Sequence, residues 1–148
     1  MAIQVAKIFF VLVLSQAGCF ASAGPADNKS AKAAVVSLEE LRAAIQDPSI
    51  LIIDVRQPSE LIETGVIPNS INIPLNILEA TLRSLSPEAF LQQYQREKPD
   101  FDTIIIFTCR SGNRSGQAQN IALNLGYIYA KNYAGGWLEW EANLPKSN

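Results

Sequence analysis

Histidine is missing from all 148 residues of this chain. Nucleophile–base dyads and triads usually rely on an imidazole, and so do most protein zinc and non-haem iron sites, so its absence excludes those classes of site. Only two cysteines are present, Cys19 and Cys109, too few for a disulfide framework or a four-cysteine zinc site. We therefore expect neither a metal nor any other cofactor.

An excess of basic charge is also missing. Lys and Arg number 12 against 14 Asp and Glu, which gives a net charge of -2. Proteins that bind nucleic acid normally carry a basic patch or run, so we expect no nucleic-acid partner. Hydrophobic residues make up 48% of the chain and charged residues 18%, a composition that supports one domain with a buried core.

The amino-terminal segment has the pattern of a secretory signal. Lys7 precedes an apolar run at residues 8–14, and small residues follow it up to Ala23. The run is too short to cross a bilayer, which takes about 20 apolar residues. We predict a signal peptide at residues 1–23, a flexible lead-in at 24–34 and a folded domain at 35–146, with no stable membrane insertion once the leader is removed.

The predicted destination of the chain is secreted or periplasmic. A mitochondrial presequence is the less favoured alternative, because such segments are rich in Arg and this one has none. A buried amino-terminal helix is a second alternative, although the apolar residues run on without the stripe of a helix that packs on one face.

The rest of the chain alternates helical and extended patterns. Ser37 and Glu40 have the spacing of a capping box, and Ser86 precedes a proline at a helix start. Short apolar, β-branched runs indicate buried strands. We predict helices over 38–46, from 87 towards 98, from Arg114 to Gly126 and over 137–142, and strands over 50–53, 71–73, 103–108 and 128–133. This alternation predicts an α/β domain with a mostly parallel sheet, whose site lies beyond the carboxyl ends of the strands.

One strand ends at Cys109, and a short polar loop leads from it into a helix. The first amides of a helix have no partner within it, and together with the helix dipole they form an anion site worth about half a positive charge. Gly112 and Asn113 can adopt the backbone angles that curl amides inward, while Arg110 and Arg114 add cationic donors. The predicted site therefore comprises Cys109 with the loop residues Arg110, Ser111, Gly112, Asn113, Arg114 and Ser115.

Such surroundings stabilise a thiolate relative to a thiol, so Cys109 is the candidate nucleophile and no histidine base is needed. An inert thiol buried at a strand end is the alternative. An inert core cysteine is rarely surrounded by two arginines and a Ser/Gly/Asn loop, so these neighbours favour the reactive interpretation.

Four features in order make the chain resemble a single-domain rhodanese, a thiosulfate-type sulfurtransferase. They are the Asp54-Val55-Arg56 segment with Glu60, the segment 65–74, the loop 109–114, and the segment 132–137. The resemblance implies a rhodanese-like fold, with a five-stranded, mostly parallel sheet and helices on both faces.

The resemblance also implies a mechanism. The Cys109 thiolate would attack the outer sulfur of thiosulfate, or of a persulfide donor, and sulfite would leave a persulfide on Cys109. Cyanide, glutathione or a protein thiol of the thioredoxin-like kind would then remove that sulfur. Two-step covalent transfer of this kind predicts ping-pong kinetics.

Two other functions stay open at this point. A non-catalytic sulfur-carrier or regulatory module would keep the fold without turnover, although inactive members of the family typically lack the cysteine. A cysteine-dependent phosphatase or arsenate reductase of the same fold has one more residue between its cysteine and arginine than Cys109 and Arg114 have. The tighter loop suits a single sulfur atom better than a phosphate.

Three charged residues outside the loop are interpreted as structural support. We predict an ion-pair clamp at a strand end, with Arg56 between the carboxylates of Asp54 and Glu60. Structural networks of this kind often mimic acid–base sites, so we interpret the three residues as support. The glycines at 135–136 should let the backbone pass close to the loop, and the tryptophans at 137 and 140 should pack in the core.

Overall fold

The structure is a computed structural model that describes residues 34–145. The predicted signal peptide at 1–23 and residues 24–33 of the predicted lead-in lie outside the described residues. Within the described range no helix is both long and apolar enough to cross a membrane.

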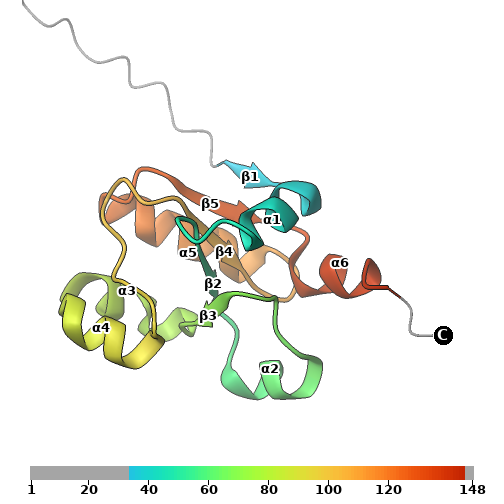
Figure 1. The fold of residues 1–148 in the computed structure, drawn as a ribbon, viewed down its shortest axis with the longest axis horizontal. Helices are drawn as coiled ribbons and strands as arrows, with labels where there is room; N and C mark the ends of the chain where they lie inside the picture. The colour runs from blue at the N-terminus through green and yellow to red at the C-terminus, as the bar shows by residue number, and fades with distance from the viewer. Residues whose placement is uncertain (1–33, 146–148) are drawn as a thin grey trace, which may run out of the picture. The chain divides into compact units, whose positions relative to one another are not determined.

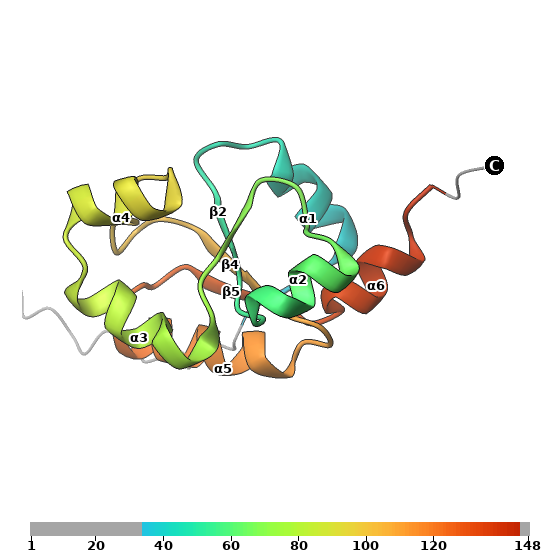
Figure 2. The same ribbon diagram turned by 90° about the horizontal axis from the view of Figure 1, so that it is seen from below.

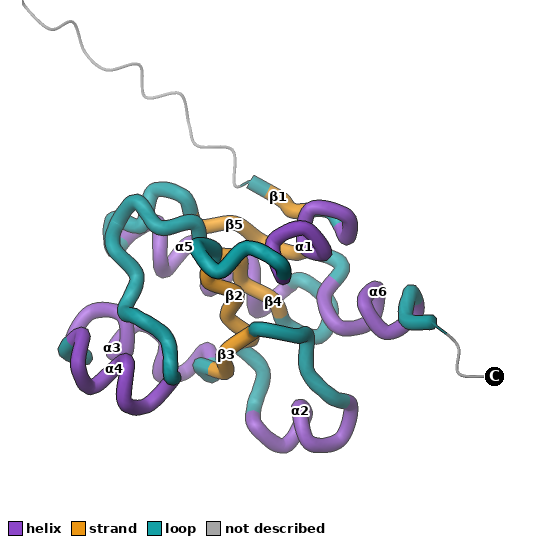
Figure 3. The backbone as a smooth tube through the Cα atoms, viewed as in Figure 1, coloured by secondary structure: helices purple, strands orange, loops and turns teal. Residues whose placement is uncertain are grey.

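A five-stranded sheet forms the centre of the domain, and all of its pairings are parallel. Its spatial order is β1-β5-β4-β2-β3, and Figure 3 shows the strands enclosed by helices. The strands are β1 (Val35–Val36), β2 (Leu51–Asp54), β3 (Ser70–Asn72), β4 (Ile105–Thr108) and β5 (Ala130–Tyr133). This confirms the α/β class and the parallel sheet predicted from the buried apolar runs.

Six helices connect or follow the strands in the described part of the chain (Figure 1). They are α1 (Leu38–Ile45), α2 (Pro58–Thr64), α3 (Leu75–Ser84), α4 (Pro87–Tyr94), α5 (Asn113–Asn124) and α6 (Gly136–Ala142). The sequence analysis did not predict α2 or α3. Helix α2 buries no residue, so it has no apolar stripe to detect, whereas α3 buries Leu78 and Leu82 at helical spacing, a signal that was present.

The sheet is buried on both faces, which confirms that helices cover both. Side chains of successive strand residues point to opposite faces. Leu51 and Ile53 of β2 join a core cluster with residues of α3, α4 and α5, while Ile52 between them joins a second cluster with residues of α1 and α6. The continuous apolar runs of the sequence reflect this two-sided burial.

Both predicted helix starts are confirmed, since Ser37 caps α1 and Ser86 caps α4, whereas one helix ends earlier than predicted. The Ser37 amide donates to the Glu40 carboxylate at 2.7 Å and the Glu40 amide to the Ser37 hydroxyl at 3.2 Å, which completes the capping box of α1. The helix predicted to run towards residue 98 instead ends at Tyr94. Gln95 adopts a left-handed conformation, with φ of 56°, and its amide donates to Leu91.

A buried ion pair closes the carboxyl end of β2. Asp54 accepts from Nε and Nη2 of Arg56, with the shortest contact 2.7 Å, and both side chains are about 1% exposed. Arg56 also donates to the Thr64 hydroxyl at 2.8 Å and to the Gly65 carbonyl at 3.0 Å, and its guanidinium lies 5.0 Å from the centre of the Trp137 ring. The clamp thereby ties the end of α2 to the sheet and to α6.

The prediction that Arg56 sits between two carboxylates was wrong in one respect. Within the described part of the chain, its only ion-pair partner is Asp54, whereas Glu60 pairs with Arg114 of the cysteine loop. The physical reason is that α2 turns its first-turn acid towards the start of α5, a tertiary contact that sequence spacing does not reveal. Trp137 and Trp140 are buried in the core, as predicted.

We predict that Arg56→Met lowers the free energy of unfolding by about 3–5 kcal/mol, because it leaves the Asp54 carboxylate buried without its partner. Urea denaturation is the measurement. Arg83→Met is the matched control, since it removes the same groups from the exposed Arg83–Glu79 pair of α3 and should cost less than about 1 kcal/mol. Equal losses in the two variants would contradict the role of the clamp.

Candidate active site: the cysteine loop between β4 and α5

The connection between β4 and α5 lies at the carboxyl end of the parallel sheet, where α/β proteins place their sites. Figures 1 and 2 show α2 and α6 at this end of the domain and α4 at the opposite end. Cys109 is the first residue after β4, and its side chain is almost completely buried, with 1% exposed. The loop is short because α5 begins at Asn113, one residue earlier than predicted.

The Cys109 sulfur is surrounded by hydrogen-bond donors. The Gly112 amide donates to Sγ at 3.1 Å, and the buried Ser115 hydroxyl lies 3.3 Å from it. When the sulfur is a thiolate it can only accept, so the Ser115 hydroxyl is then the donor. These interactions supply the stabilisation that a histidine base provides in other cysteine sites.

The pKa of Cys109 is lowered from that of an ordinary thiol. Burial alone raises it, because desolvation penalises the charged form. The Ser115 hydroxyl and the amides of Ser115, Ser111 and Gly112 together outweigh burial, because they hydrogen-bond the thiolate. The direction agrees with the prediction of a reactive rather than inert thiol.

Backbone amides at the start of α6 bind two carbonyls of the loop. The Trp137 amide donates to the Cys109 carbonyl at 2.8 Å, and the Leu138 amide donates to the Arg110 carbonyl at 3.1 Å. Gly136, with φ of 59°, allows this close approach, since a Cβ there would collide with both carbonyls. This confirms the predicted close pass to the loop for Gly136, whereas Gly135 lies against the side chain of Glu139.

The side chain of Asn132 on β5 anchors a third loop carbonyl. Its Nδ2 donates to the Gly112 carbonyl at 3.3 Å. Gly112 has a φ of 86° and lies against Ala134, where a Cβ would clash with the backbone. With its carbonyls bonded outward, the loop turns amides towards Sγ, a nest-like arrangement that binds anions.

The two loop arginines are placed very differently. The Arg110 side chain is exposed, and among residues 34–145 its guanidinium makes no hydrogen bond or ion pair. Arg114, in the first turn of α5, donates Nη1 to Glu60 Oε2 at 2.6 Å and Nη2 to Glu60 Oε1 at 2.7 Å. The hydrogen bonds from Arg114 lower the pKa of Glu60 to about 2, so this pair is charged at any working pH.

Most of the predicted site residues meet at one place. Ser111, Gly112 and Ser115 hydrogen-bond the Cys109 sulfur, and Arg114 binds Glu60, whereas the side chains of Arg110 and Asn113 are exposed. Asp54 and Arg56 lie at the carboxyl end of β2, next to β4, and the Val55 amide between them donates to the Thr108 carbonyl at 2.9 Å. The sequence analysis missed the amide donors of α6 and the Asn132 side chain. Their signal was the segment 132–137, of which only the glycines and tryptophan were interpreted.

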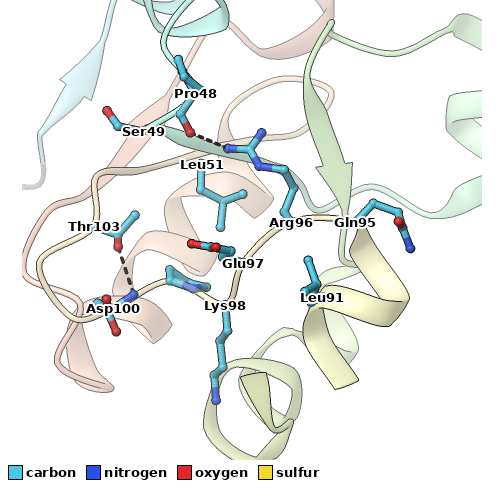
Figure 4. Close-up of a pocket in the computed structure, with 11 residues that line it drawn as sticks. Pro48, Ser49, Leu51, Leu91, Gln95, Arg96, Glu97, Lys98, Asp100 and Thr103 are labelled. Carbon is cyan, nitrogen blue, oxygen red and sulfur yellow. Dashed lines mark hydrogen bonds between the residues drawn. The ribbon is translucent and has the colours of Figure 1, made fainter. Parts of the chain in front are cut away.

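A separate hollow lies away from the cysteine loop. A pocket of about 380 Å³ lies at the amino ends of β2 and β4, lined by Leu51, Arg96 and Thr103 among others (Figure 4). The Arg96 guanidinium donates hydrogen bonds to the carbonyls of Pro48 and Ile50, each at 3.1 Å, and so stabilises the turn before β2. Because the pocket holds no cysteine and opens at the opposite end of the strands, it is not part of the cysteine site.

The fold and the loop of residues 34–145 define an α/β domain whose cysteine is held at a strand end by main-chain amides. The model of the rhodanese-like domain family matches residues 37–143, and this chain belongs to that family.

Similar proteins support the same assignment. Rhodanese domain-containing protein CG4456 of Drosophila melanogaster is 44% identical over 106 residues, covering 72% of this chain and 95% of that protein. The human thiosulfate:glutathione sulfurtransferase is 41% identical over 74% of this chain and 95% of its own length. The structure of the human single-domain sulfurtransferase TSTD1 has a TM-score of 0.69 and 38% identity, covering 75% of this chain and 97% of that one.

We predict that Ser115→Ala slows alkylation of Cys109 by iodoacetamide at neutral pH by roughly tenfold, because a hydrogen bond to a charged group contributes about 1.5–3 kcal/mol. Loss of the hydroxyl raises the thiol pKa, so the rise of the alkylation rate moves to higher pH. Ser111→Ala is the control, since Ser111 contributes through its amide, which alanine retains. An equal fall in the alkylation rate of both variants would contradict the role of the Ser115 hydroxyl in stabilising the thiolate.

Proposed function

We propose that this chain is a rhodanese-type sulfurtransferase that takes a sulfane sulfur from thiosulfate onto Cys109 and passes it to a thiol. The observation that carries the proposal is the amide-lined thiol at the carboxyl end of β4, with its lowered pKa. The relatives that are named as sulfurtransferases, over nearly their whole length, support the same activity.

In the first step the Cys109 thiolate attacks the outer sulfur of thiosulfate. A bond forms between Sγ and that sulfur, the sulfur–sulfur bond of thiosulfate breaks, and its electron pair leaves with sulfite. The persulfide that remains is an anion at its outer sulfur, and we expect the N–H groups of the loop to stabilise that charge as they stabilise the thiolate. Arg110, exposed beside the loop, attracts the dianionic donor.

In the second step an acceptor thiolate attacks the outer sulfur of the persulfide and regenerates the Cys109 thiolate. No redox cofactor or external base is needed, because the leaving group in each step is a stabilised anion. Glutathione or a thioredoxin-like protein is the proposed natural class of acceptor, and cyanide is a convenient artificial one.

We expect purified protein to form thiocyanate from thiosulfate and cyanide, and Cys109→Ser to lose this activity entirely. The intact mass of the wild type should rise by about 32 Da after treatment with thiosulfate alone, because one sulfur is carried covalently. Turnover by the Ser variant would refute the proposal. A persulfide that forms but is never transferred would favour the sulfur-carrier module, and rapid hydrolysis of an aryl phosphate would favour the phosphatase alternative.

We also propose that the chain is exported through its amino-terminal segment, on the sequence pattern of residues 1–23. Expressed in full in a secreting host, the protein should appear outside the cytoplasm with an intact mass that begins at Gly24. Retention of residues 1–23 in the purified protein, or import into mitochondria, would contradict export.

A further inference from the structure

Arg114 and Glu60 meet through two parallel hydrogen bonds, at 2.6 and 2.7 Å. A guanidinium binds a carboxylate, a phosphate or a sulfate through the same planar fork of N–H donors. Both terminal nitrogens of Arg114 already face carboxylate oxygens, so the end-on fork formed by Nη1 and Nη2 is occupied, and a second oxyanion would be left with the Nε–H edge beside the negative charge of Glu60. The pair is at the surface of the site rather than deep inside, with side chains 33% and 26% exposed.

The same pair changes the charge of the loop. The hydrogen bonds to Glu60 are the main cause that raises the pKa of Arg114, and the negative charge of the Cys109 thiolate raises it further. The guanidinium of Arg114 therefore interacts electrostatically with both the carboxylate and the thiolate. The full negative charge of Glu60 offsets the positive charge of the Arg114 guanidinium. Of the two loop arginines, only Arg110 therefore offers uncompensated positive charge to an incoming anion.

Glu60 is held in place by contacts that do not depend on Arg114. The Gln57 amide donates to Glu60 Oε2 at 3.0 Å at the start of α2. The far end of that helix is bound by the buried Arg56 through Thr64 and Gly65. The carboxylate is thus presented to Arg114 by a fixed helix.

We propose that Glu60 is a specificity-determining residue that keeps Arg114 from binding tetrahedral oxyanions. The loop then retains a single sulfur atom on Cys109 through its amides but grips sulfite, sulfate and phosphate weakly. The consequence for sulfite release rests on the proposed function, whereas the selection against oxyanions does not. This also revises the sequence-based role of Arg114 as a donor to the substrate anion.

Binding of inorganic sulfate and phosphate tests the proposal without any turnover. Titration calorimetry is performed in the Cys109→Ser background, where no sulfur chemistry can occur. Adding Glu60→Gln frees the Arg114 fork and should tighten sulfate binding by about tenfold or more, the range of a charge-assisted bidentate contact. Glu63→Gln, which removes an equal charge from an exposed position of the same helix, should change the affinity less than about twofold.

A further substitution shows whether Arg114 is responsible. Glu60→Gln combined with Arg114→Met should lose the gain in affinity. No gain in Glu60→Gln, an equal gain in Glu63→Gln, or a gain that persists without Arg114 would each overturn the proposal. Glu60→Ala serves as a second variant if the glutamine retains one bond to Arg114, and thermal unfolding of every variant confirms that it is folded.

The kinetic counterpart uses the chain with Cys109 intact. Sulfite should inhibit Glu60→Gln at about tenfold lower concentration than the wild type, by the same binding argument. Because the calorimetric arm does not need activity, an inactive wild type would refute the proposed function and leave the anion selection open to measurement.

Discussion

Main-chain amides converging on the Cys109 sulfur are the interaction on which the rest of this site depends. A thiol buried to this degree would normally resist ionisation, because the thiolate loses its hydration. The loop replaces the lost water with N–H groups and the Ser115 hydroxyl, which require no movement when charge develops on the sulfur. In a protein without histidine, this arrangement supplies the activation of the nucleophile.

The amides can converge only because the carbonyls of the same loop are bonded elsewhere. The start of α6 binds two of them and the Asn132 side chain binds a third. These partners come from β5 and from the start of α6, and the positive φ values of Gly112 and Gly136 make the close approach possible. The site is therefore a joint product of the cysteine loop and the carboxyl-terminal part of the domain.

The charged residues around the loop form two ion pairs with separate roles. Arg56 and Asp54 are buried and tie α2 to the sheet, so their contribution is to position. Arg114 and Glu60 lie at the rim, where their pairing sets the charge that a substrate meets. Because Arg56 and Asp54 hold α2 in place, that helix presents Glu60 to Arg114. The stability of α2 is thereby linked to the electrostatics around the thiol.

The local sequence was sufficient to predict much of the fold and of the cysteine site. Apolar runs predicted four of the five strands, a capping box predicted the start of α1, and a cysteine between a strand and a helix predicted the amide nest, because each depends on neighbours along the chain. Strand β1 has two residues and helix α2 buries none, so neither carries a periodic pattern. The choice of Arg114 rather than Arg56 as the partner of Glu60, and the anchoring of the loop by α6, were decided only by the tertiary structure. Residues 54 positions apart, such as Glu60 and Arg114, become neighbours through strand order and helix placement, which no local spacing encodes.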